Sequence, residues 1–312
     1  MVLEGNISLF DTTSGDLHQW VENVPGTTIP YMAWSPDGRQ LAYETNQSGT
    51  WGIYIVEGSE SGEAMAEAKP LFDSSDADEK HPLWSPDGSR IAYTINNNLQ
   101  VANPDGSDPH DLGVIIDDDS LTFLWSPDGS RLLYGAKAET GWQVKSVDAA
   151  SGAISDLASG EGTVYLFNLS SDNVLLLMVE NNDGDRILAL DVNSGELTDF
   201  NVFGYNPRWS PDSSHIAYFT AFDASGTEGY QIALMEAQGK NGTVLNISFK
   251  PQLASDIDWS PDGTQLAFTV NATDYEYNFT LHLMDANTGE VQFFKDAYVS
   301  LTPSWRPCTL PA

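Results

Sequence analysis

The chain has 312 residues, a length that suits one large domain or two ordinary ones. It carries 13 Lys and Arg against 45 Asp and Glu, a formal net charge of −32, which argues against nucleic acid and anionic membrane surfaces as partners. Its single cysteine, Cys308, excludes an intrachain disulfide, so packing alone must hold the fold together.

The first residues predict three short strands. Residues 2–4, 6–10 and 17–21 have strand-like composition, and residues 11–15 have the composition of a turn. These segments match the second, third and fourth strands of a four-stranded unit whose first strand is missing. We expect the missing strand at the other end of the chain, over residues 297–301 and on to Trp305, so that one composite unit closes the fold.

A five-residue motif, Trp-Ser-Pro-Asp-Gly, recurs through the rest of the chain at intervals of 40–50 residues. Near-intact copies occupy residues 34–38, 84–88, 125–129, 209–213 and 259–263, and worn copies occupy residues 169–173 and 305–308. Such a period predicts a repeat architecture. Pro presets φ for a tight turn and Gly takes the left-handed conformation that leads back into an antiparallel strand. The Trp ends the preceding strand, and its size predicts burial between neighbouring sheets.

Further strands are expected after each motif. Second strands are predicted at residues 40–43, 90–93, 131–134, 215–218 and 265–268, and third strands at 52–56, 99–102, 142–147, 187–190, 231–235 and 281–284. Residues 58–70 are rich in Ala, Glu and Gly and predict a helical turn at the rim. Six internal repeats and the composite unit predict one closed domain over residues 1–312, an all-β, seven-bladed propeller with four-stranded antiparallel blades.

The motif and the strands around it resemble the repeat of the TolB-like, or WD-repeat-like, β-propeller family. The residues that carry the resemblance run from Pro82 to Tyr93 as Pro-x-Trp-Ser-Pro-Asp-Gly-x-x-Ile-Ala-Tyr, with related stretches at the other copies. The resemblance covers nearly the whole chain and implies a propeller fold. It leaves the function open, because propellers of this kind serve as binding platforms and as enzyme scaffolds.

Acidic residues gather in loops that share one face of a propeller, namely Asp73, Asp76, Asp78, Glu79, Asp117, Asp118, Asp119, Asp183, Asp185, Asp223 and Asp274. Closely spaced carboxylate oxygens are what Ca²⁺ requires. Asp73, Asp76, Asp78, Asp183 and Asp185 are therefore candidate calcium ligands. Neither segment has the full twelve-residue calcium-loop pattern, and a solvated acidic loop is the commoner explanation for such segments. No other cofactor is expected.

Candidate binding residues lie just before the Trp of several repeats, near the central channel of a propeller: Tyr31, His81, Asn206, Arg208, Asp256 and Asp258. His81 could bind a ligand or titrate near neutral pH, or could simply bond a neighbouring carboxylate. Arg208, if it lies opposite Asp256 or Asp258, is most simply interpreted as a structural ion-pair partner.

Asparagine sequons suggest an exported protein. Seven are present, at Asn6, Asn46, Asn168, Asn241, Asn246, Asn271 and Asn278, where chance gives about three. We expect an extracytoplasmic protein (periplasmic, secreted or at the cell surface) whose signal or anchor is not in this chain, with no direct membrane insertion.

Motifs of hydrolases, zinc enzymes and phosphate-binding enzymes are absent from the sequence. The leading hypothesis is a non-catalytic binding or scaffold module that recognises a protein or peptide through its acidic face or its channel mouth, as a monomer or within a larger assembly. One alternative is a propeller enzyme, or the propeller half of a larger hydrolase or lyase. A second is a structural subunit that assembles by lending its N-terminal strands to a neighbour.

Overall fold

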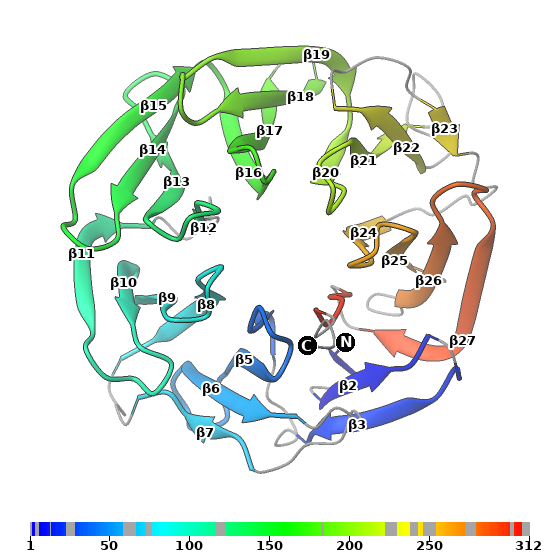
Figure 1. The fold of residues 1–312 in the computed structure, drawn as a ribbon, viewed down its shortest axis with the longest axis horizontal. Helices are drawn as coiled ribbons and strands as arrows, with labels where there is room; N and C mark the ends of the chain where they lie inside the picture. The colour runs from blue at the N-terminus through cyan, green and yellow to red at the C-terminus, as the bar shows by residue number, and fades with distance from the viewer. Residues whose placement is uncertain are drawn as a thin grey trace.

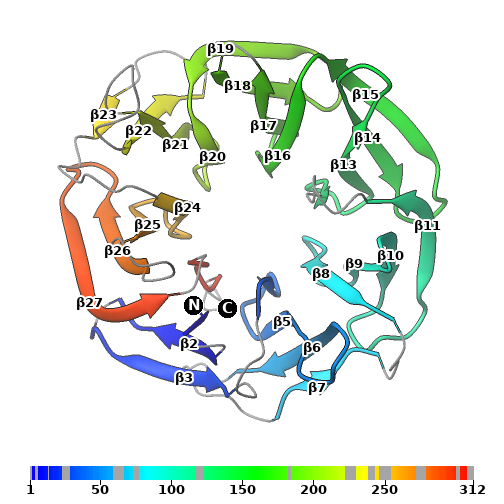
Figure 2. The same ribbon diagram turned by 180° about the vertical axis from the view of Figure 1, so that it is seen from behind.

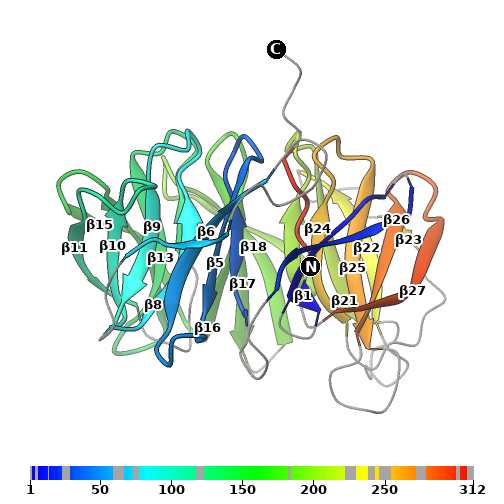
Figure 3. The same ribbon diagram turned by 90° about the horizontal axis from the view of Figure 1, so that it is seen from below.

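The computed structural model describes residues 2–3, 6–12, 14–22, 29–58, 67–72, 77–116, 123–181, 184–221, 230–237, 243–245, 254–271, 279–299 and 303–307. Within these ranges every regular element is a β-strand, and antiparallel sheets stand around a central axis as a ring (Figures 1 and 2). Figure 3 shows the ring from its edge as a thick disc, with the strands crossing its thickness. The family's propeller fold, expected from the motif, is therefore confirmed.

Six sheets have four strands each, and in each of them the chain moves from the innermost strand to the outermost. The first blade contains β4 (Met32–Trp34), β5 (Gln40–Thr45), β6 (Gly52–Glu57) and β7 (Lys69–Pro70), and the second contains β8 (Glu79–Trp84), β9 (Ile91–Ile95), β10 (Asn98–Ala102) and β11 (His110–Ile115). The third contains β12 (Phe123–Trp125), β13 (Arg131–Lys137), β14 (Trp142–Asp148) and β15 (Ile154–Gly160), and the fourth contains β16 (Thr163–Leu169), β17 (Val174–Asn181), β18 (Gly184–Asp191) and β19 (Leu197–Phe203). The fifth contains β20 (Tyr205–Trp209), β21 (His215–Ala221), β22 (Tyr230–Glu236) and β23 (Thr243–Leu245), and the sixth contains β24 (Ala254–Trp259), β25 (Gln265–Asn271), β26 (Phe279–Asp285) and β27 (Val291–Val299).

The expectation of seven four-stranded blades is wrong, because the described residues form six. The remaining sheet lies between the sixth and first blades and has three strands, β1 (Val2–Leu3), β2 (Asn6–Phe10) and β3 (Leu17–Val21). It packs against the first blade: Ile7 and Trp20 share a buried cluster with Leu41 and Tyr43, and the rings of Trp20 and Trp34 lie 5.1 Å apart. The three predicted N-terminal strands are thus present, without a described fourth strand.

The predicted inner strand over residues 297–301 is also wrong in its described part. Residues 297–299 continue the outer strand β27 of the sixth blade, where Val299 pairs with Phe279 and Tyr298 with Thr280. A register shift beside Thr280 lets β27 follow β26 to its end. The composition of this segment favours a strand, but composition does not select the partner strand. Of the predicted helical turn over residues 58–70, residues 59–66 lie outside the described residues, and Lys69–Pro70 form β7.

Each near-intact motif forms the same turn, as its sequence predicts. In the third blade the hydroxyl of the buried Ser126 donates to Asp128 Oδ1 at 2.6 Å and accepts the amide N–H of Arg131 at 3.0 Å. Asp128 Oδ1 also accepts the amide N–H of Ser130 at 3.0 Å and its hydroxyl at 2.8 Å. Gly129 takes the left-handed conformation, with φ of 68°. The side chain of the aspartate therefore replaces solvent in holding the turn closed.

The tryptophans of the motif pack between blades, as expected from their size. Trp84, Trp125, Trp209 and Trp259 are buried, and each indole N–H donates to a backbone carbonyl. The carbonyl acceptors of Trp84, Trp125 and Trp259 belong to the residue before the Trp position of the preceding blade. The hydrophobic clusters likewise join strands of adjacent blades, so the core is a series of seams between sheets.

We predict that Asp128→Ala lowers the free energy of unfolding by about 1 kcal/mol at pH 7, because one carboxylate oxygen accepts three hydrogen bonds in the turn. These bonds lower the pKa of Asp128 to about 2. Since the folded pKa lies below the ordinary value of 3.8, this stabilisation is present above pH 4 and is lost as the pH falls toward 2. Urea unfolding at pH 7 and pH 2.5 measures both effects.

The control is Asp172→Ala in the worn turn, where the aspartate is exposed and accepts no hydrogen bond from the described residues. We expect it to change stability by less than about 0.5 kcal/mol. An equal loss in the two variants, or a loss in Asp128→Ala that persists unchanged at pH 2.5, would contradict this account.

Candidate functional site

The candidate binding residues lie on the innermost strands of the ring, except Tyr31, which directly precedes β4. Tyr31, His81, Asn206 and Asp256 each stand three positions before the Trp of their blade, and Arg208 and Asp258 stand one position before it. Register shifts occur at His81, Asn206 and Asp256, and His81 and Asn206 have φ of 58° and 51°. Such bulges turn side chains away from the regular alternation of a strand.

One cavity of about 360 Å³ brings together five of the six predicted residues: Tyr31, His81, Arg208, Asp256 and Asp258. Asn206 does not line it, so the structure does not group that residue with the others. The remaining wall is formed by Pro30, Met32, Ala33, Pro82, Leu83, Phe123, Leu124, Ile257, Pro303 and Ser304. The cavity thus combines an apolar wall with a few polar groups, the composition typical of ligand sites, and its volume lies near the lower end of their range.

An aromatic pair forms one side of the cavity. The rings of Tyr31 and His81 meet edge to face, with centroids 4.6 Å apart. The buried carboxylate of Glu44 accepts the backbone N–H of His81 at 2.5 Å, and Thr94 Oγ1 lies 3.3 Å from His81 Nδ1. The carboxylate of Glu44 thus bonds the backbone N–H of His81, whereas the expectation concerned the side chain, whose ring faces Tyr31.

An ion pair forms the other side. Arg208 Nη2 donates to Asp256 Oδ1 at 3.3 Å, and Arg208 Nε donates to the carbonyl of Ile257 at 3.3 Å. The guanidinium also lies over the ring of Phe167, 5.5 Å from its centroid. Arg208 is thus the structural ion-pair partner that the sequence suggested, and of the two candidate aspartates it pairs with Asp256.

Asp258 carries the remaining charge of the cavity. Its Oδ2 accepts the backbone N–H of Trp305 at 3.0 Å, and burial raises its pKa to about 6. The pKa of Asp258 is lowered by hydrogen bonds from the N–H groups of Trp305 and Trp259 and by the charge of Arg208. The negative charge of Asp256 raises it further. No ion pair of Asp258 is present among the described residues.

The candidate calcium ligands are only partly described. Asp73, Asp76 and Asp183, like Asp117–Asp119, lie outside the described residues. Asp78 accepts the backbone N–H of Trp51 at 3.2 Å, and Asp185, opposite Glu180 on the neighbouring strand, has a pKa raised by burial and by that second charge. Within the described part of the chain no group of three or more His, Cys, Asp or Glu could hold a metal ion.

The sequons divide in the same way. Asn6, Asn46, Asn168 and Asn271 are described, whereas Asn241, Asn246 and Asn278, like Cys308, lie outside the described residues. Asn168 stands in the inner strand β16, half-buried, and its Oδ1 accepts the backbone N–H of Trp209 at 3.0 Å. Its amide therefore links the inner strands of the fourth and fifth blades.

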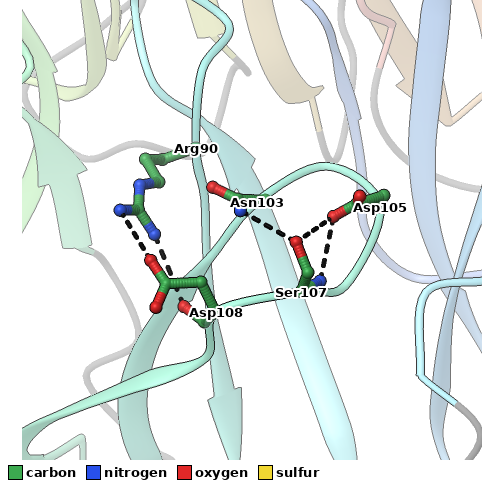
Figure 4. Close-up of polar contacts among 5 residues, drawn as sticks. All are labelled: Arg90, Asn103, Asp105, Ser107 and Asp108. Atoms are coloured by element: carbon green, nitrogen blue, oxygen red, sulfur yellow. Dashed lines mark hydrogen bonds and ion pairs between the residues drawn. The ribbon is translucent and has the colours of Figure 1, made fainter.

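Pockets between the motif turns of adjacent blades are a different kind of feature. One pocket of about 470 Å³ lies beside Arg90, whose guanidinium is held by the side chain of Asp108 at 3.0 Å and by its carbonyl at 3.4 Å (Figure 4). In the same turn Asn103 and Asp105 bond the hydroxyl of Ser107 at 2.8 and 2.6 Å (Figure 4). A second pocket of about 470 Å³ lies at the corresponding seam beside His215. Since both follow from the repeated turn, the channel cavity is the better candidate for a dedicated site.

Sequence reasoning missed the apolar wall of the cavity. Leu83 and Leu124 stand immediately before the Trp of their blades, the same position as Arg208 and Asp258. The position was a usable signal, but only its polar occupants were singled out. Ser304 occupies the same position, immediately before Trp305, and Pro303 precedes it.

We predict that Asp258→Asn raises the free energy of unfolding by about 1–3 kcal/mol at pH 7.5. Burial raises the folded pKa of Asp258 from 3.8 to about 6. Ionisation of this carboxylate therefore destabilises the wild-type fold above pH 6, and the free energy of unfolding increases as the pH falls from 6 to 4. An amide oxygen can still accept the N–H of Trp305. The gain of the variant should therefore shrink toward pH 4, as measured by thermal unfolding across this range. With Asp172→Asn as the control for net charge, a variant less stable than wild type at every pH would overturn this prediction.

Comparison with known proteins adds the family. A model of the TolB beta propeller domain matches residues 95–310, more than half of the chain. No curated protein matches the sequence. Among the described residues no helix is long and apolar enough to cross a membrane.

Solved structures show the same fold at low sequence identity. An oligogalacturonate lyase in complex with manganese superposes with a TM-score of 0.70 at 13% identity, covering 92% of this chain and 83% of that chain. An oligogalacturonate lyase from Vibrio parahaemolyticus gives 0.71 at 13% identity, covering 92% and 84%. TolB from Acinetobacter baumannii gives 0.58 at 16% identity, covering 91% and 74%. These likenesses concern the fold alone, and the family follows from the sequence model and the motif turns together: the chain belongs to the TolB β-propeller domain family.

Proposed function

We propose that this chain is a non-catalytic binding or scaffold module that recognises a protein or peptide at the channel cavity. The observation that carries the proposal is the cavity itself, to which Tyr31, His81, Arg208 and Asp258 contribute from four different blades. A site assembled from several blades on rigid inner strands is a preorganised surface for a ligand. The family's propeller fold is compatible with this role, and the acidic surface favours a basic rather than an acidic partner.

We also propose that residues 1–312 form a single domain closed by the C-terminal segment. Trp305 donates its indole N–H to the carbonyl of Asp258 at 3.1 Å, as the tryptophans of other blades do. The next residue, Arg306, donates from Nε to the carbonyl of Gly38 at 2.7 Å and lies over the ring of Trp34. The segment thus joins the sixth blade to the first, beside the sheet of β1–β3.

The alternative of a self-assembling subunit makes a different prediction about mass. If β1–β3 close the ring of their own chain, static light scattering should give a monomer near 34.0 kDa at all concentrations. Exchange of these strands between copies would give dimers or larger species, and would support the structural-subunit alternative instead.

The localisation proposed is extracytoplasmic, as for an exported binding module. The support is the excess of sequons and the low content of Lys and Arg, 13 in 312 residues. Calcium binding by the acidic loops and glycosylation of the sequons remain part of this proposal.

The enzyme alternative rests on the similarity of fold to oligogalacturonate lyases, which extends over 92% of this chain. It is tested directly by assaying lyase activity on oligogalacturonate with and without added manganese. Turnover that is lost in a His81→Ala variant would replace the binding proposal with an enzymatic one.

We predict that Tyr31→Ala abolishes capture of the natural partner from an extract of the source organism. Tyr31 is 45% exposed, and its ring forms the aromatic side of the cavity. An exposed aromatic anchor in a recognition site commonly contributes 2 kcal/mol or more to binding, about a thirtyfold loss in affinity.

The matched control is Phe203→Ala, because Phe203 is 49% exposed on the outer strand β19, away from the cavity. A protein retained by wild type and by Phe203→Ala but lost by Tyr31→Ala supports recognition at the cavity. A partner lost equally by both variants, or by neither, would place the binding surface elsewhere.

A further inference from the structure

The charges that line the channel cavity do not balance. Its lining contains one cation, Arg208, and two carboxylates, Asp256 and Asp258. The guanidinium of Arg208 is already held within the protein, because it donates to Asp256 and to the carbonyl of Ile257 and lies over the ring of Phe167. The pair neutralises itself, and Asp258 is left as the uncompensated charge of the cavity.

The two oxygens of Asp258 are not equivalent. Oδ2 accepts the backbone N–H of Trp305 at 3.0 Å, whereas for Oδ1 the described residues provide no ion pair and no donor other than the backbone N–H of the adjacent Trp259, which helps to lower the pKa of this carboxyl group. Asp258 is half-buried, so part of the residue remains exposed. Since Asp258 lines the cavity, its second oxygen is available to a group that enters there.

The available oxygen favours one kind of cation. A guanidinium binds a carboxylate best through two parallel hydrogen bonds, one to each oxygen, and Trp305 already occupies one of them. An ammonium is a point charge with rotatable donors and needs only one oxygen. Burial, which raises the pKa of Asp258, makes its lone charge costly, and a ligand cation would offset that cost.

The opposite wall suits the stem that carries an ammonium. Tyr31, Phe123 and Leu124 give the cavity an apolar and aromatic side. A lysine side chain has four methylene groups that pack against such surfaces while the charged end meets its counter-ion. A volume of about 360 Å³ accommodates a side chain of this size rather than a folded element.

We propose that the channel cavity binds the lysine side chain of a partner peptide, with the ammonium donating to Asp258 Oδ1 and the methylene stem against the aromatic wall. This inference rests on the proposed peptide-binding function and names the group that is recognised. It makes lysine, rather than arginine or an apolar residue, the specificity-determining residue of the partner.

The test uses the full chain and blocked pentapeptides of alanine whose central residue is lysine, arginine, Nε-acetyl-lysine, glutamate or leucine. Binding is measured by calorimetry at pH 7.5 for wild type, for Asp258→Asn, and for Asp172→Asn, which removes the same charge from an exposed turn. n-Butylamine is included because it carries the ammonium without a peptide backbone. Thermal unfolding of each variant confirms that it is folded.

We expect the lysine peptide to bind wild type and Asp172→Asn alike, and Asp258→Asn at least tenfold more weakly. The arginine peptide should bind wild type at least threefold more weakly than the lysine peptide, and the acetylated and glutamate peptides should not bind. n-Butylamine should bind more weakly than the lysine peptide, and equal binding would overturn recognition of a peptide.

Three outcomes would overturn the inference in different ways. If the lysine and leucine peptides bind equally, and Asp258→Asn binds both as wild type does, lysine recognition is wrong while peptide binding at the cavity stands. If no peptide binds but Tyr31→Ala still releases a partner from extract, lysine recognition is again wrong and the proposed function survives. If neither experiment shows binding at the cavity, both proposals fail.

Discussion

The hydrogen bond from a tryptophan indole to a carbonyl of the preceding blade is the interaction on which the ring depends. Trp84 bonds the carbonyl of Ala33, Trp125 that of Leu83, and Trp305 that of Asp258, all at 3.1 Å. A blade has few hydrogen bonds to its neighbours because its strands are satisfied within the sheet. The indole therefore sets the spacing and rotation of adjacent blades, while its ring fills the seam between them. Each such bond contributes on the order of 1 kcal/mol, and the ring needs the whole series.

The same tryptophan fixes what faces the channel. Because it ends the inner strand at a set depth, the residue one position before it supplies both the carbonyl for the next indole and a side chain near the axis. Leu83 and Arg208 have the same backbone role and differ only in their side chains. The scaffold thus holds residues as different as Ala33, Leu83, Arg208 and Asp258 at this position, which allows ligand-binding groups to vary while the fold is kept.

Asp258 both holds neighbouring blades together and places a charged side chain at the channel cavity. Its carbonyl and its carboxylate both bond Trp305, so it helps to hold the segment that joins the sixth and first blades. The carboxylate is nevertheless an expensive choice at a site where burial raises its pKa to about 6. An amide could hold the N–H of Trp305 as Asn168 holds that of Trp209. A charge kept where a neutral group would suffice for structure is typical of a binding site.

The sequence by itself determined the repeat, the motif turns and the burial of most motif tryptophans, and five of the six polar residues that it singled out near the channel line one cavity. It could do so because each depends on short stretches of chain: Ser126, Asp128 and Gly129 close a turn with one another, and Trp125 must bury its ring wherever the turn occurs. Tertiary structure decided the rest. Residues 297–299 could pair as a strand with more than one neighbour, and only the assembled sixth blade assigns them to β27. Arg208 could reach either aspartate in principle, and the bulge at Asp256 brings that carboxylate to it, leaving Asp258 as the unpaired charge. Strand composition and charge type are properties of a residue, whereas the choice of partner is a property of the space around it.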